Sequence, residues 1–158
     1  MTHADTPDAF AERRKAATDR LRAGTGIDEA MIDRLVETFY AKVRDDALIG
    51  PIFAGRVQDW APHLAQMKLF WSSVARSTGV YQGRPMPKHL PLPIDATHFD
   101  RWLGLFEATA AEVCPPVAAA HFVERARRIA ESLELGVANA NTVLLGPGER
   151  YRRPWAPD

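Results

Sequence analysis

Residues 83–93 read Gly-Arg-Pro-Met-Pro-Lys-His-Leu-Pro-Leu-Pro, and this stretch divides a chain that is otherwise patterned for helices. Its four prolines exclude a continuous helix from Tyr81 to Pro93, because proline lacks the amide hydrogen that a helix needs and clashes with the preceding turn. The prolines on both sides of His89 also limit the conformations that can present its imidazole. Such preorganisation suits a ligand, although the spacing alone is more often that of an ordinary surface-turn histidine.

On either side of this stretch, apolar residues recur at helical spacing, and no run of alternating β-branched residues indicates a sheet. We therefore expect an all-α protein with four principal helices and a charged, alanine-rich helix before them. Asp59 and either Asp95 or Thr97 are the expected N-caps of two helices, and Pro115-Pro116 start another. The expected helices span residues 9–21, 28–45, 59–77, 97–113 and 116–138.

These elements predict one globular domain over residues 26–138. We expect residues 1–25 to be an N-terminal extension that is helical or mobile. Residues 139–158 contain glycines, prolines and an Arg-Tyr-Arg-Arg cluster, and we interpret them as a mobile tail.

The composition excludes several classes of protein. Among the 158 residues, 20 basic side chains balance 20 acidic ones, which argues against a nucleic-acid binder that relies on phosphate neutralisation. No apolar run approaches the ~20 residues that a membrane span needs, and the polar start of the chain does not resemble a signal peptide. We therefore expect a cytoplasmic protein. A single cysteine, Cys114, excludes an intramolecular disulfide and a thiolate zinc site.

Several side chains on the expected helices suggest a pocket. His63, Met67 and Trp71 follow one another at a spacing of four residues, so one imidazole heads an apolar helix face. Tyr40 and Trp102 each combine an apolar body with one hydrogen-bond donor. The alternatives are a half-buried helix histidine and aromatic side chains that simply pack in the core, and the pattern alone favours these alternatives.

Two basic residues, Arg84 and Lys88, lie close to His89 in the sequence. They could pair with the carboxylates of a propionate-bearing macrocycle, because guanidinium and ammonium groups bind carboxylates through charge-assisted hydrogen bonds. Solvated loop charges are an equally good interpretation of both residues.

Taken together, several stretches resemble the group III truncated haemoglobins, and the resemblance covers roughly Ile27 to Leu135. It implies a truncated globin fold, a two-over-two helical sandwich around haem b, with His89 as the proximal iron ligand. Tyr40, His63 and Trp102 would then form the distal pocket. The residues implied to contact haem are Phe39, Phe53, Met67, Phe70, Trp71, Arg84 and Lys88. The stretches that carry the resemblance are 39–44 (Phe-Tyr-Ala-Lys-Val-Arg), 50–53 (Gly-Pro-Ile-Phe), 60–63 (Trp-Ala-Pro-His), 70–71 (Phe-Trp), 83–93 and 99–103 (Phe-Asp-Arg-Trp-Leu).

The resemblance implies a protein that binds O2, CO and NO reversibly at a five-coordinate iron. We expect O2, NO or peroxide chemistry instead of bulk transport, with dioxygenase-like or peroxidase-like activity depending on an external reductase. No nucleic-acid or membrane partner is expected. Two alternatives are a haem-based gas or redox sensor acting through a protein partner and a haem-free helical interaction module.

Overall fold

The computed structural model describes residues 6–154, and the regular elements of that part are seven α-helices. The all-α prediction is therefore confirmed. The helices are α1 (Pro7–Thr25), α2 (Glu29–Asp45), α3 (Gly50–Ala54), α4 (Trp60–Arg76), α5 (Pro85–His89), α6 (Ala96–Val113) and α7 (Pro116–Ala140). Within the same residues, no helix has the length and apolarity to cross a membrane.

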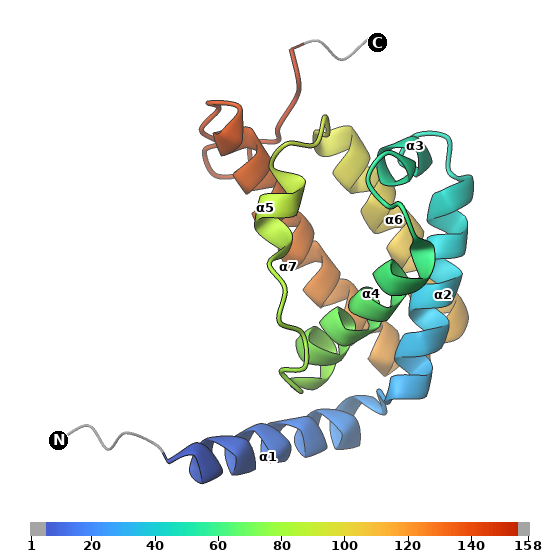
Figure 1. The fold of residues 1–158 in the computed structure, drawn as a ribbon, viewed down its shortest axis with the longest axis vertical. Coiled ribbons are helices and arrows are strands. Elements are labelled where there is room, and N and C mark those ends of the chain that lie inside the picture. Colours follow the sequence, from blue (N-terminus) through green and yellow to red (C-terminus); the bar gives the residue numbers. More distant parts are fainter. Residues whose placement is uncertain (1–5, 155–158) are drawn as a thin grey trace, which may run out of the picture.

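Four long helices form the frame of the fold. α6 packs along α7, and α2 packs against both α6 and α4 (Figure 1). The short α5 lies opposite α4, and α7 passes behind both (Figure 1). The proline-rich stretch thus contains one turn and a half of helix that the sequence analysis did not predict, although it is not a continuous helix. Its prolines at positions 85 and 87 fall in the first turn, where no amide hydrogen bond is lost.

Local sequence signals account for the ends of the long helices. The carboxylates of Asp59 and Asp95 accept backbone N–H groups at the starts of α4 and α6, as predicted. At the start of α6, His98 also bonds back to the Asp95 amide and completes a capping box. α7 begins at Pro116, as predicted.

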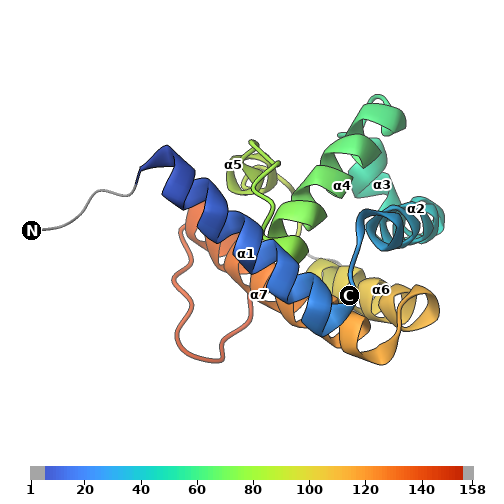
Figure 2. The same cartoon turned by 90° about the horizontal axis from the view of Figure 1, so that it is seen from below.

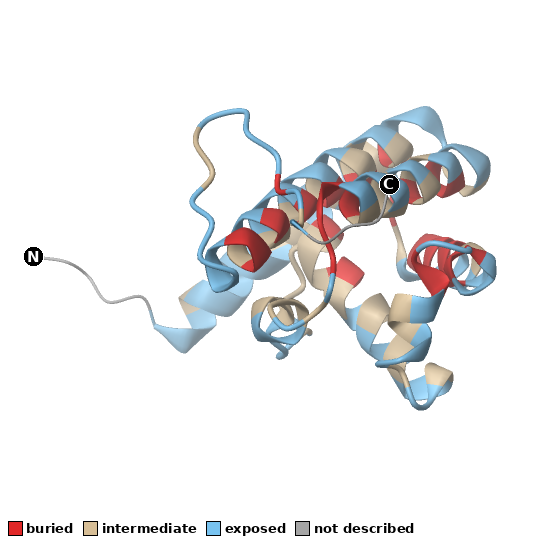
Figure 3. Cartoon of the chain, turned by 90° about the horizontal axis from the view of Figure 1, so that it is seen from above, coloured by how far each residue is buried: buried red, intermediate tan, exposed pale blue. Residues whose placement is uncertain are grey.

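The core lies where α2, α4, α6 and α7 face one another (Figure 3). On α2, Ile32, Leu35 and Val43 are fully buried at the spacing predicted for an amphipathic helix. Their burial is worth roughly 1.5–3 kcal/mol each relative to exposure. α1, by contrast, has no buried residue and lies across α4 and α7 at the edge of the frame (Figure 2).

The tail differs from its prediction. Residues 141–149 form an exposed loop, but the chain then returns to the frame, and Tyr151 is only 2% exposed. Arg150 pairs with Glu134 of α7 and Asp100 of α6. We interpreted residues 139–158 as a mobile tail; in the structure, residues 150–153 of this segment lie against α6 and α7. Residues 155–158 and 1–5 lie outside the described residues.

A buried carboxylate, paired with an exposed arginine, fixes the turn between α2 and α3. Asp46 accepts the amides of Leu48 and Ile49 and pairs with Arg101 of α6 at 2.6 Å, with its side chain 3% exposed. The hydrogen bond from Arg101, helped by the two amides, holds the pKa of Asp46 below its ordinary value despite burial. The charged carboxylate therefore stabilises the folded state at any pH above the ordinary pKa of an aspartate.

We expect Asp46→Asn to lower the free energy of unfolding by about 1–3 kcal/mol near neutral pH, because a buried charge-assisted bond is lost. The contribution of Asp46 disappears as the pH falls through its depressed folded pKa, so the two proteins should converge in acid. Urea unfolding across a pH series measures this difference. A constant gap between the two proteins at every pH would contradict the assignment.

Candidate functional site

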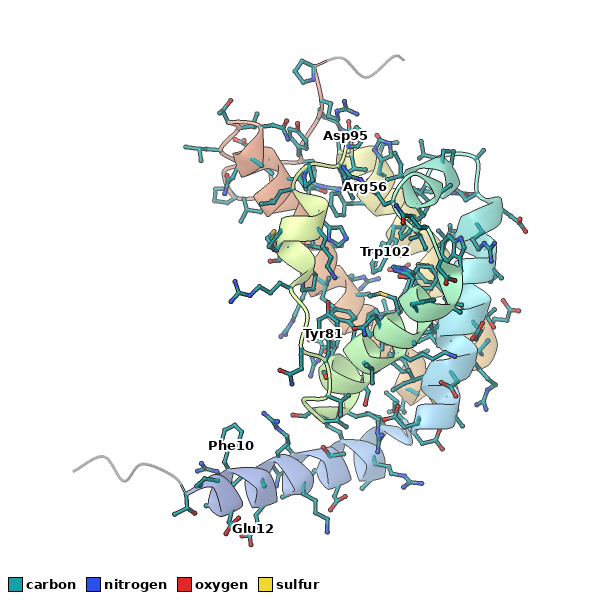
Figure 4. All side chains as sticks on the ribbon, in the orientation of Figure 1. Phe10, Glu12, Arg56, Tyr81, Asp95 and Trp102 are labelled. Carbon is teal, nitrogen blue, oxygen red and sulfur yellow. The ribbon has the colours of Figure 1, made fainter. Side chains whose placement is uncertain are left out.

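A cavity of about 670 Å³ opens between α5 on one side and α2, α3 and α4 on the other. α6 and α7 contribute the remaining wall. Figure 4 shows Trp102 in the space between α4 and α5. Most of the lining is apolar or aromatic, with a few polar side chains, as is typical of sites for small molecules and cofactors.

His89 ends α5 and lines this cavity. Its Nδ1 lies 2.6 Å from the carbonyl oxygen of Pro85, one helical turn earlier. Because a carbonyl oxygen only accepts hydrogen bonds, Nδ1 must carry the proton, and the lone pair of the neutral ring is on Nε2. Burial lowers the pKa of His89, and the nearby positive charge of Lys88 lowers it further. The ring is thus oriented and neutral, the state in which histidine binds metals.

His63 reaches the cavity from the first turns of α4. Its ring meets those of Tyr40 and Trp60 edge-on, with centroids 5.2 and 5.5 Å apart. Nε2 is buried and has no hydrogen-bond partner in the structure. Burial, and then the charge of Lys88, lower the pKa of His63. An unsatisfied buried nitrogen costs about 1–3 kcal/mol, so the site favours a guest that can bond to it.

Tyr40 and Trp102 line the same cavity from α2 and α6. Both are backed by Phe39, whose ring centroid lies 5.0 Å from that of Tyr40 and 5.6 Å from that of Trp102. Burial raises the pKa of the Tyr40 phenol, so it keeps its proton and remains a hydrogen-bond donor. The tight aromatic packing holds both polar side chains in place.

Two exposed cations, Arg56 and Lys88, line the cavity, and neither has an ion-pair partner among residues 6–154. Arg56 follows α3 (Figure 4), whereas Lys88 is on α5, so the two cations come from different elements. A ligand with carboxylates could therefore bind both.

Comparison with known proteins decides the family. The family model described as bacterial-like globin matches residues 24–134. The chain belongs to this family. The chain is 40% identical over 86 residues to the group 3 truncated haemoglobin ctb of Campylobacter jejuni, across 51% of this chain and 68% of that protein. It is 33% identical over 83 residues to the group 2 truncated haemoglobin YjbI of Bacillus subtilis, across 49% and 61%.

Solved structures agree with this family. The group III truncated haemoglobin from Campylobacter jejuni superposes with a TM-score of 0.64 at 34% identity, over 68% of this globin and 89% of that chain. The haemoglobin from the thermophilic phototrophic bacterium Chloroflexus aurantiacus gives a TM-score of 0.60 at 26% identity, over 72% and 95%. The resemblance to group III truncated haemoglobins and the truncated globin fold are thus confirmed, and membership implies haem as the cofactor.

The structure brings most of the expected site residues of this globin together. Two are not at the cavity. Phe39 is next to Tyr40 on one helix, so the two point in directions about 100° apart, and Phe39 packs in the core with 1% of its surface exposed. Arg84 is exposed at the start of α5 and does not line the cavity. Those that line the cavity are Tyr40, Phe53, His63, Met67, Phe70, Trp71, Lys88, His89 and Trp102.

The sequence analysis missed much of the wall formed by α6, α7 and the segments around α5. Phe99 precedes Trp102 by one helical turn, and Ile129 and Leu133 are four residues apart on α7. Their helical spacing could have indicated one shared face, but not that it faced a cavity. Tyr81 and Leu92 come from irregular segments, where periodicity gives no signal.

α5 rests on α7 beside Gly136, where the end of the Met86 side chain occupies the space of a Cβ. A Cβ built on Gly136 would overlap with the sulfur of Met86, whereas one built on Gly104, an exposed glycine of α6, meets nothing within 4 Å. A side chain at position 136 would therefore displace Met86 from its present position against α7.

We expect Gly104→Ala to raise the free energy of unfolding by roughly 0.5–1 kcal/mol, since alanine favours the helix. Gly136→Ala should gain less or lose stability, because Met86 and α5 must move. Thermal or urea unfolding of the two variants measures the difference. Equal stabilisation by both substitutions would show that α5 is not seated on Gly136.

Proposed function

We propose that this globin binds haem b in the 670 Å³ cavity, with His89 as the proximal ligand to the iron. The observation that carries this proposal is the hydrogen bond between His89 Nδ1 and the Pro85 carbonyl. This hydrogen bond leaves the lone pair on Nε2 as the only one the ring can offer. Histidines that bind a metal typically donate their other ring N–H to a carbonyl or carboxylate in this way. Arg56 and Lys88 would hold the propionates at the cavity wall.

Haem held by one histidine supplies one open iron position for a diatomic gas such as O2, NO or CO. Opposite His89, this globin provides the Tyr40 hydroxyl and the Trp102 indole N–H as donors, and the Nε2 of His63 without a partner. Donors fixed in a water-poor site stabilise negative charge more strongly than donors in water. This set therefore favours firm retention of O2.

Firm retention suits chemistry on the gas better than bulk transport. We infer O2, NO or peroxide chemistry in the cytoplasm, driven by an external electron donor. In the sensor alternative, terminal segments contact a protein partner. Residues 150–153 are instead bound to α6 and α7, which weighs against that role for this segment.

The iron ligand can be assigned among the three histidines that line the cavity, His63, His89 and His98. His89→Gly should lose the absorption spectrum of five-coordinate ferrous haem and recover it when imidazole is added, because free imidazole replaces the missing ring. His98→Gly should keep the wild-type spectrum. If purified protein reconstituted with haem shows no Soret band, the proposal fails, and a normal spectrum in His89→Gly without imidazole would remove His89 as ligand.

Tyr40→Phe removes one donor and retains the ring that packs against Phe39 and His63. We expect O2 release to accelerate about tenfold, since one such hydrogen bond is worth ~1.5 kcal/mol. Stopped-flow displacement of O2 by CO measures this rate. The rate of CO release from the same variant is the control. Bound CO carries less negative charge than bound O2, so the loss of the Tyr40 donor should change its release rate less. An unchanged O2 rate would exclude the Tyr40 hydroxyl as donor.

A further inference from the structure

The segment that carries His89 has little packing of its own. α5 is five residues long, none of them is buried, and α7 is the only described helix that it contacts. The segment therefore depends on what holds its two flanks, residues 77–84 before it and residues 90–95 after it. Movement of either flank would move His89 relative to the cavity.

The C-terminal segment holds the second flank. The Tyr151 carbonyl accepts the amide of Ala96, and the Arg153 amide donates to Asp95. The guanidinium of Arg153 donates to the carbonyl of Pro93 at 2.7 Å. These bonds join residues 151–153 to the point where the proline-rich stretch ends and α6 begins.

A buried carboxylate locks this segment in place. Glu134 of α7 is 6% exposed, and the hydrogen bonds it accepts among the described residues come from Arg150 and from the amide of Tyr151. Arg150 also reaches Asp100 on α6 at 2.7 Å. If Arg150 lost its guanidinium while the rest of the segment stayed docked, Glu134 would keep only the Tyr151 amide as a donor among the described residues, and a buried carboxylate without its cation is strongly unfavourable. Docking of residues 150–153 therefore depends on the Arg150–Glu134 pair.

The first flank, residues 77–84, is held by fewer contacts, and these come from α1. On α1, the Thr18 hydroxyl donates to the carbonyl of Ser77 at 3.4 Å, and the Arg14 guanidinium lies against Gly79. Both supports come from segments outside residues 24–134, the part that the globin family model matches.

We propose that residues 150–153 are a strap that positions His89 and so slows the loss of haem. The strap lies outside the residues that the globin family model matches, and the inference rests on the haem site proposed above. Arg150, Tyr151 and Arg153 are positioning residues, and none of them lines the cavity. Arg150 anchors the strap on Glu134. Tyr151 then holds Ala96, and Arg153 holds Asp95 and Pro93.

The test uses the full chain loaded with haem. Arg150→Ala should lose haem to an excess of an apoglobin acceptor about tenfold faster than wild type, if the lock is worth one factor of ten in affinity. The iron–histidine stretching band of the ferrous protein should shift or broaden in resonance Raman spectra, because His89 is held less firmly. Arg150→Lys, which keeps the charge, should restore part of both properties.

Arg101→Ala is the matched control, because it also removes an arginine from a buried carboxylate, Asp46, but at the turn between α2 and α3. It should lower thermal stability while leaving the iron–histidine band at its wild-type position. Arg153→Ala removes only the surface bond from its side chain to Pro93, so it tests the strap even if Arg150→Ala does not fold. Haem loss from Arg153→Ala should be two- to threefold faster than from wild type, which corresponds to about half a kcal/mol of affinity.

The strap is overturned if folded Arg150→Ala and Arg153→Ala retain the wild-type haem-loss rate and stretching band. It is also overturned if Arg101→Ala shifts the band equally, since that result would indicate general destabilisation. A wild-type chain that takes up no haem would overturn the haem site and the strap together. If the wild-type protein holds haem and the variants lose haem no faster than it does, the strap alone is overturned.

Discussion

The hydrogen bond between His89 Nδ1 and the Pro85 carbonyl is the constraint on which the site depends. It selects the tautomer, orients the ring and leaves Nε2 with the lone pair. The bond spans a single helical turn, so it exists only because residues 85–89 form α5. Prolines at the first turn start that helix without loss of a hydrogen bond, and the prolines that follow prevent it from continuing. A short helix between rigid flanks is the outcome.

A short helix cannot stabilise itself, and its position is therefore set from outside. Gly136 lets α5 approach α7 closely, and the tail holds the residues that follow it. Two buried carboxylates are used in the same way at opposite sides of the cavity: Asp46 with Arg101 near α3, and Glu134 with Arg150 near the tail. Removing one partner of such a pair is costly, so each pair fixes one connection of the frame instead of adding much net stability.

The sequence was sufficient to predict what depends on neighbouring residues. The caps at Asp59 and Asp95 and the start of α7 follow from local hydrogen-bonding rules, and the structure confirms them. The docking of Tyr151 could not be predicted, because its hydrophobic cluster includes Ile94 and Phe99, which are far away in the sequence. The same holds for Arg56 at the cavity wall, where proximity to His89 in the sequence had instead suggested Arg84.

The adjacent residues Phe39 and Tyr40 illustrate a further limit. Both belong to a stretch that resembles the group III proteins, but they point about 100° apart on α2. Only the structure shows that Tyr40 lines the cavity whereas Phe39 packs in the core. Phe39 then has a different role: it holds the rings of Tyr40 and Trp102 from behind.

His63 and His89, two of the three histidines that line the cavity, differ in the property on which their proposed roles depend. Burial and the charge of Lys88 keep both rings neutral, so charge does not distinguish them. Hydrogen bonding does. One nitrogen of His89 is bound to the backbone of its own helix, whereas the Nε2 of His63 is buried with no partner. A fixed ring suits a permanent bond to a metal, and an unsatisfied one suits a ligand that comes and goes. This difference supports the proposal that α5 provides the proximal side of the site and α4 the distal side.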